Sequence, residues 1–233
     1  MTMGWNAKST GGYAKDSGAA KSNALEIAKV LMANGWTDKA IAAMLGNVTY
    51  ESGLNPWRWQ GDYVPAFTEF VGWNAEQAAL HGYGLVQFTP ANTYINADNA
   101  VAYGGKGYSP HFSDKTAIPN DGNAQMLFFL SIVTSSWLHQ LYNYYSTPFL
   151  NIGVDISPWY YTTYENFKKG INNTGKSLSL ADLTGVFELC YERPAAEYAA
   201  SSYNVRVSNA EYWYKNIKAK SGMTWIYYLK RRR

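Results

Sequence analysis

The 233-residue sequence is poor in cysteine and in charged residues. Cys190 is the only cysteine, so no disulfide can form within the chain, and secretion through an oxidising route has no support. It lies in an apolar helical pattern, which favours a buried, inert thiol over a nucleophile. Charged residues make up 16% of the chain and hydrophobic residues 47%. This balance is typical of a globular protein with a substantial core and excludes a disordered chain.

Several partner classes also lack their usual signals. The N-terminus has no charged region followed by an apolar core, and no apolar run approaches a membrane span, so we expect neither a signal peptide nor a membrane partner. The net charge is only +3, and the one basic cluster is the terminal run 230–233, so we expect no nucleic-acid partner. We expect no metal and no cofactor, because metal-ligand spacing is absent around His81, His111 and His139.

Aromatic residues, by contrast, are abundant. The chain has 20 Tyr, 9 Trp and 9 Phe, or 16% of its residues. Rings with a polar tip suit carbohydrate surfaces and protein interfaces alike. Six of them fall in the irregular stretch 57–73, which predicts a loop or short hairpin lining a cleft, or alternatively a flap that covers the core. A mildly basic surface would favour an anionic polymer such as a bacterial wall.

One carboxylate occupies an unexpected position. Continuing the helical spacing of the apolar residues 41, 44, 45 and 48 places Glu51 on the same face, in the last turn of a helix that Thr37 caps. Gly53 offers a left-handed stop, and Pro56 prevents the helix from resuming. Desolvation and the negative helix end would both favour a protonated carboxyl, which suits a general acid. The alternative is a solvated last residue that bends out to water.

A second stretch, 82–90, combines two glycines with a buried-looking amide. Gly82 and Gly84 allow close backbone approach, and Thr89-Pro90 is expected to begin a short helix. Gln87 stands among apolar neighbours, so its amide must either bond the backbone or face a polar ligand.

The remaining periodicity predicts a mainly α fold, with a minor β-hairpin as its only β structure. The predicted domains are an N-terminal arm (1–22), a catalytic domain (23–220) and a basic C-terminal tail (221–233). Asn23 with Glu26 is a plausible first cap, and Ser179 with Asp182 forms a capping box later in the chain. The sequence predicts helices over about 23–33, 37–51, 126–141, 179–190 and 208–220, the third of them central, buried and stopped by Thr147-Pro148.

The two stretches described above, around Glu51 and around Gln87, resemble sequence blocks of a known family. Glu51-Ser-Gly-Leu-Asn-Pro56 is similar to the Glu-Ser block of lytic transglycosylases and goose-type lysozymes, and Gly84-Leu-Val-Gln87 to their second block. The pattern most resembles that of bacteriophage tail lysozymes, which is echoed at Gly46-Asn47, 51–53, Asn55-Pro56, 83–87 and 191–195. The resemblance implies a lysozyme-like fold and cleavage of peptidoglycan between N-acetylmuramic acid and N-acetylglucosamine.

The resemblance also implies roles for particular residues. Glu51 would be the general acid, and Tyr83 and Gln87 would lie in the sugar-binding groove; we add Ser52, Trp59 and Gln60 as expected substrate-binding residues. Asp62 is our candidate for a second catalytic carboxylate, with Glu69 and Glu192 in reserve. Alternatively the sugar's own 6-hydroxyl closes on the anomeric carbon, as in a lytic transglycosylase.

Two other classes of function stay open. One is a glycan-binding phage tail component that cuts nothing, and the other is a structural or assembly protein that uses its aromatic rings as an interface. The expected partners are bacterial peptidoglycan and, as an open alternative, other phage tail proteins. The expected location is the phage tail, or the host cytoplasm before release.

Overall fold

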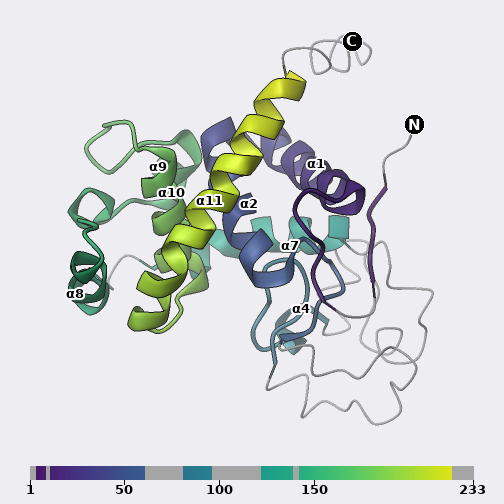
Figure 1. Ribbon diagram of the computed structural model, residues 1–233, viewed down its shortest axis with the longest axis horizontal. Coiled ribbons are helices and arrows are strands. Elements are labelled where there is room, and N and C mark those ends of the chain that lie inside the picture. Colours follow the sequence, from purple (N-terminus) through teal and green to yellow (C-terminus); the bar gives the residue numbers. More distant parts are fainter. Residues whose placement is uncertain (1–3, 9–10, 61–80, 96–121, 139–141, 222–233) are drawn as a thin grey trace. The chain divides into compact units, whose positions relative to one another are not determined.

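Figure 1 shows the computed structural model, which describes residues 4–8, 11–60, 81–95, 122–138 and 142–221. The described residues confirm the predicted mainly helical fold. Within them no strand forms, and β pairing is limited to the isolated bridges Trp59–Tyr83, Tyr83–Phe88 and Ile171–Ser177, so the expected hairpin is not among them. The helices are α1 (Gly18–Ala33), α2 (Asp38–Ser52), α4 (Asn92–Ile95), α7 (Gly122–Ser136), α8 (Tyr142–Asn151), α9 (Tyr164–Lys169), α10 (Leu180–Phe187) and α11 (Ala196–Ser221).

The chain divides into two compact units. Unit 1 comprises Met1–Val30 and Val48–Ser135, and unit 2 comprises Leu31–Asn47 and Ser136–Arg233. Both sequence blocks singled out above, 51–56 and 82–90, therefore belong to unit 1.

Helix α2 forms as predicted, whereas α1 begins earlier than expected. The Thr37 hydroxyl accepts the amide of Ala40 at 3.4 Å, as an N-cap does, and α2 ends one residue after Glu51. Helix α1 begins at Gly18, so the prediction that Asn23 caps it was wrong. Asn23 is fully buried inside the helix, where its amide serves contacts with other segments instead.

The helix predicted over 126–141 forms, but its bounds were wrong. Helix α7 begins at Gly122 and ends at Ser136, and a separate helix α8 begins at Tyr142. Pro148 does not stop a helix but lies inside α8, between Tyr145 and Phe149, whose side chains are both buried. Burial of these two rings outweighs the intrinsic cost of proline in a helix, which spacing and propensity alone do not reveal.

In unit 2, α10 and α11 lie side by side, and α8 also packs against α11 (Figure 1). The predicted capping box at Ser179 and Asp182 is confirmed. After Phe187 the chain continues as a π-helix, Glu188–Glu192, which contains the buried Cys190. Helix α11 begins at Ala196, well before the predicted residue 208.

Aromatic rings fill much of the interior of unit 2. Trp137 contacts Phe167 at a centroid distance of 5.1 Å and donates its ring N–H to the carbonyl of Thr162, which confirms its predicted core role. Trp159 contacts both Phe149 and Tyr203, at centroid distances of 5.5 and 5.7 Å, and these two rings also contact each other. Most of the large aromatic side chains therefore form the core here, and a high aromatic content is not in itself a sign of ligand binding.

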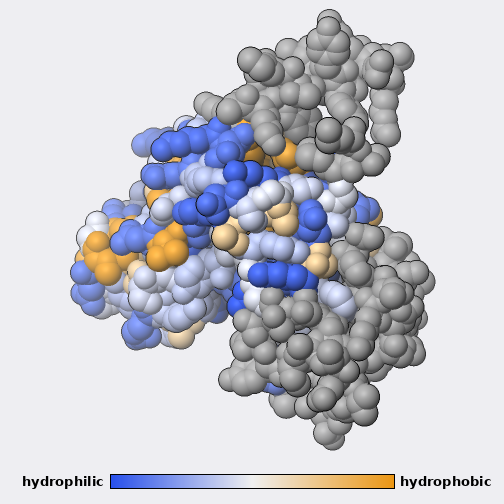
Figure 2. All heavy atoms as spheres, turned by 45° about the vertical axis from the view of Figure 1, so that its right-hand side comes forward, coloured by the Kyte–Doolittle hydropathy of each residue, from blue (hydrophilic) through white to orange (hydrophobic). Residues whose placement is uncertain are grey.

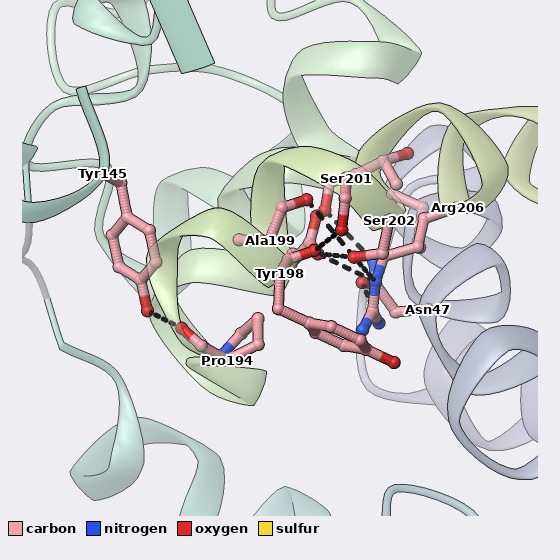
Figure 3. Close-up of polar contacts among 11 residues, drawn as sticks. Asn47, Tyr145, Pro194, Tyr198, Ala199, Ser201, Ser202 and Arg206 are labelled. Atoms are coloured by element: carbon pink, nitrogen blue, oxygen red, sulfur yellow. Dashed lines mark hydrogen bonds and ion pairs between the residues drawn. The ribbon is translucent and has the colours of Figure 1, made fainter. Parts of the chain in front are cut away.

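A charged network is buried in the same unit (Figure 3). Arg206 of α11 contacts Glu188 of the π-helix at 2.9 Å, and neither side chain is exposed to solvent. Ser202 donates to Glu188 at 2.7 Å, and Arg206 donates to Asn47 of α2 at 3.0 Å. The charges are therefore paired and hydrogen-bonded, which is the condition under which buried charges are tolerated.

The described surface in Figure 2 is mostly hydrophilic, with a few hydrophobic patches. The most exposed large hydrophobic side chains include Leu150, Tyr144, Tyr198 and Val205. None of the helices in the described part of the chain combines the length and the apolar character needed to cross a membrane.

Candidate functional site

Glu51 occupies the position that the sequence indicated, in the last turn of α2. The helix ends at Ser52, and the Glu51 side chain is half-buried at its C-terminal end. Two consecutive residues in the left-handed region follow, Gly53 with φ 57° and Leu54 with φ 59°. They turn the chain sharply, so Glu51 stands where the helix gives way to a tightly folded loop.

The N-terminal arm contacts this loop directly. The amide of Tyr13 donates to the carbonyl of Gly53 at 2.8 Å, and a Cβ atom placed on Gly53 would collide with the Cα of Gly12. Gly53 is therefore required for two reasons, its positive φ and the close approach of the arm backbone. Burial raises the pKa of the Tyr13 phenol, and the Lys8 ammonium lies 5.0 Å from the centre of its ring.

Two buried asparagines hold the arm and the loop together. The side-chain amide of Asn55 donates to the carbonyls of Lys8 and Gly11, both at 2.9 Å, and its oxygen accepts the amide of Trp57. Asn23 of α1 donates to the carbonyl of Leu54 at 2.7 Å and pairs with the backbone of Asn6. Both amides are largely satisfied by backbone groups, which fixes the conformation of the segment that follows Glu51.

The second block is bonded to the continuation of that loop. The carbonyl of Arg58 accepts the amide of Gly84 at 2.8 Å, and the Gln87 side chain at 3.0 Å. The next two residues extend the contact, because Trp59 bridges to Tyr83 and the amide of Gln60 donates to the carbonyl of Gly82 at 2.9 Å. The segments around 51–60 and 82–88 are therefore one connected structure within unit 1.

The nitrogen of the Gln87 amide bonds the backbone, which is one of the two possibilities that the sequence left open. This Nε2 atom donates to the carbonyls of Arg58 and Gly84, at 3.0 and 2.9 Å. Because both partners are acceptors, the orientation of the amide is fixed, and both N–H groups are used. The side chain is half-buried and the backbone has φ 47°, a left-handed value that is uncommon outside glycine.

Three of the expected substrate-binding residues lie in the interior. Tyr83 and Trp59 are 0% and 3% exposed and contact each other at a centroid distance of 4.6 Å. They continue into a cluster with Tyr94, Phe88 and Phe128. Ser52 is fully buried, and its hydroxyl donates to the carbonyl of Val48 at 3.0 Å. Burial of these three side chains favours a supporting role over direct contact with a ligand.

The other expected residues are placed differently. Gln60 is exposed, and its side-chain oxygen accepts the amide of Gly82 at 2.8 Å. Asp62 and Glu69 lie outside the described residues. Glu192 belongs to unit 2, at the end of the π-helix. Within the described residues, no group of three or more His, Cys, Asp and Glu side chains could hold a metal ion.

Sequence reasoning missed several residues that hold this site. The sequence predicts Asn23 only as a helix cap and Asn55 only as part of a motif, and it gives no prediction for Gln125 of α7. The missed signal was an isolated amide among apolar residues, since Gln125 stands between Ala124 and Met126 in a strongly apolar helix.

Comparison with known proteins agrees with the motif pattern. Residues 22–217 match a family described as phage tail lysozyme. The chain is also similar to Morphogenesis protein 1 of Bacillus phage B103, with 27% identity over 202 residues. That similarity covers 85% of this chain but only 40% of the relative, so the chain spans less than half of the relative's length.

Proposed function

Because the chain belongs to the phage tail lysozyme family, we propose that it cleaves the glycan strand of bacterial peptidoglycan, with Glu51 as the general acid. The bond cut is that between N-acetylmuramic acid and N-acetylglucosamine. Glu51 gives its proton to the glycosidic oxygen as positive charge develops on the sugar ring. The observation that carries this proposal is the placement of a half-buried carboxyl at the end of α2, beside a loop bonded to the second block.

The remaining residues take different roles in this proposal. Both N–H groups of Gln87 are used by the backbone, so its side-chain oxygen is the group that accepts from a sugar hydroxyl or acetamido N–H. Ser52, Trp59 and Tyr83 support the site from the interior, and the exposed Gln60 borders it. Asp62 remains our proposed second carboxylate, acting as base or nucleophile on the sugar.

A second candidate function is a role in phage particle assembly. It is favoured by one observation, the similarity to a phage protein named Morphogenesis protein 1. The two functions are compatible if the enzyme is carried in the phage tail, and they differ in what the isolated chain does to purified peptidoglycan. An assembly protein would form a stable complex with tail components and release no glycan fragments.

The test is mass spectrometry of purified peptidoglycan after digestion by the purified chain. Reducing muramic acid ends would identify a hydrolase, and anhydro-muramic ends a lytic transglycosylase, in which the 6-hydroxyl closes the ring. Products cut within the peptides would overturn the proposal. Binding to peptidoglycan without soluble products, by wild type and Glu51→Gln equally, would instead identify a glycan-binding component. Asp62→Asn tests the second carboxylate: full activity in that variant would remove it from the mechanism.

A further inference from the structure

Gln125 of α7 contacts the backbone on both sides of the candidate site. Its side chain is fully buried. The side-chain nitrogen donates to the carbonyl of Pro56 at 2.6 Å, and the side-chain oxygen accepts the amide of Leu85 at 2.8 Å. Pro56 lies five residues after Glu51, and Leu85 lies two residues before Gln87. One amide therefore joins the segment that follows the proposed acid to the segment that carries the proposed sugar contact.

The packing around this amide leaves it little freedom. Gly84 has φ 84°, and a Cβ atom placed on it would collide with the Gln125 side-chain oxygen. The amide also cannot turn over, because its partners are one backbone acceptor and one backbone donor. A small displacement of Gln125 would therefore move both segments, or break one of the two bonds.

Substitution of Gln125 would leave two backbone groups without their partner. These groups are the Pro56 carbonyl and the Leu85 amide. They belong to the same hydrogen-bonded network as the Arg58 carbonyl, which accepts from Gly84 and Gln87. Catalysis by a positioned acid depends steeply on geometry, and a displacement of about 1 Å can cost about a hundredfold in rate. The loss of the amide should therefore lower turnover as well as the free energy of unfolding.

We infer that Gln125 is a positioning residue for glycan cleavage. It sets the spacing between the loop that follows Glu51 and the second block, 82–90, which contains Gln87. The inference rests on the proposed function, because it assigns a role within that reaction. Gln125 touches neither substrate nor reacting atoms in this account. It acts through the backbone of Pro56 and Leu85.

The first test compares Gln125→Met with Val133→Ala. Gln125→Met keeps an unbranched side chain of similar length and removes both hydrogen bonds, whereas Val133→Ala removes core contacts eight residues later in the same helix. Rates of soluble glycan release are measured against peptidoglycan concentration, well below each melting temperature. We expect kcat to fall about tenfold to a hundredfold in Gln125→Met with KM nearly unchanged. Val133→Ala should lower the melting temperature and leave kcat as in wild type.

The second test uses Gln125→Glu as a conditional rescue. A protonated carboxyl has one donor and one acceptor, like the amide in this setting, whereas a carboxylate cannot donate to the Pro56 carbonyl. Burial favours the protonated form of the introduced group. Activity relative to wild type should therefore be highest at acid pH and fall as pH rises, adding one deprotonation to the pH profile. Loss of packing alone would give a reduction independent of pH.

The outcomes separate this inference from the proposed function. Wild-type release of glycan with unchanged kcat in Gln125→Met would overturn the positioning role and leave the function intact. Absence of release by wild type would overturn the function. In that case amide hydrogen exchange still tests whether Gln125 holds the two segments in place. Gln125→Met should speed exchange in peptides covering 54–60 and 82–88. Unchanged exchange there would overturn the inference in either case.

Discussion

The two units of the molecule provide partners for their buried polar groups in different ways. In unit 1 neutral amides from Asn23, Asn55, Gln87 and Gln125 bond to backbone groups around the loop that follows Glu51. In unit 2 the buried network is centred on a full charge pair, Glu188 with Arg206. An amide holds a donor and an acceptor at once without introducing a charge.

This difference matters for a site that we propose to act through a carboxyl. A neutral amide can fix the loop after Glu51 without adding a fixed charge that would bias the carboxyl towards one protonation state. A buried ion pair costs much more to desolvate and is lost as a unit when one partner is removed. We therefore expect substitutions in unit 2 to act mainly on stability, and those in unit 1 to act also on the reaction.

The largest stability effect is expected from breaking the charge pair. Arg206→Met leaves Glu188 buried without its countercharge, so the free energy of unfolding should fall by about 3–5 kcal/mol. Equilibrium urea unfolding measures this loss. The double variant Glu188→Gln/Arg206→Met should recover most of it, because no unpaired charge remains. A loss below about 1 kcal/mol in the single variant would contradict the view that the pair is a coupled unit.

The next effect contrasts two glycines with similar backbone angles. Gly84 and Gly175 have φ of 84° and 80°, but a Cβ at Gly175 would meet nothing within 4 Å, whereas at Gly84 it would strike Gln125. Gly175→Ala should cost about 1–2 kcal/mol from backbone strain alone. Gly84→Ala should cost about 1–3 kcal/mol more, because it also overpacks the interior. Equal losses in the free energy of unfolding for the two variants would show that the contact between Gly84 and Gln125 does not contribute to stability.

A smaller effect is expected where the N-terminal arm is held. Asn55→Ala removes the bonds to Lys8 and Gly11, so the free energy of unfolding should fall by about 1–3 kcal/mol. Proteolytic cleavage of the arm should also become faster. Asn204→Ala, at an exposed position of α11, is the matched control and should be neutral or slightly stabilising. An arm that stays equally protected in both variants would contradict its attachment through Asn55.

The smallest effect concerns the thiol of unit 2. Burial raises the pKa of Cys190 to about 12, so at pH 8 the folded protein holds about a thousandfold less thiolate than the unfolded chain. Labelling by a thiol reagent at pH 8 should therefore report unfolding. Because the unfolded thiol ionises first, this group should lower stability only as pH rises above about 9. Rapid labelling of the native protein would show that the π-helix opens locally.

Local sequence signals predicted local structure well. Thr37 and Gly53 bounded α2, and Ser179 with Asp182 marked the start of α10, because a cap is satisfied by residues that are neighbours in the sequence. The burial of Cys190 and Trp137 followed from apolar spacing in the same way. Each of these features depends on a few consecutive residues.

Features that depend on distant partners were not predicted. Pro148 suggested a helix end, but burial of the adjacent rings keeps it inside α8. The early start of α11 was also missed, and that of α1 was missed although it is local, since the Ser17 hydroxyl accepts the amide of Ala20 at 3.1 Å. Spacing also could not indicate that Gln125 bonds to Pro56 and Leu85, which are 69 and 40 residues away. For the same reason the expected sugar contacts Trp59 and Tyr83 could not be told from core residues.

The most direct test of Glu51 as the general acid compares the rates at which Glu51→Gln and Glu26→Gln release soluble glycan from peptidoglycan. Glu26 lies on α1, where it pairs with Lys29 at 2.6 Å and its side chain is only 18% exposed, so its replacement is a matched control for removing a partly buried carboxylate away from the proposed site. We predict that Glu51→Gln abolishes release of soluble glycan from purified peptidoglycan while its melting temperature is unchanged or slightly higher. Glu26→Gln should digest like wild type. Glycan release by Glu51→Gln at the wild-type rate would contradict the assignment of Glu51 as the general acid.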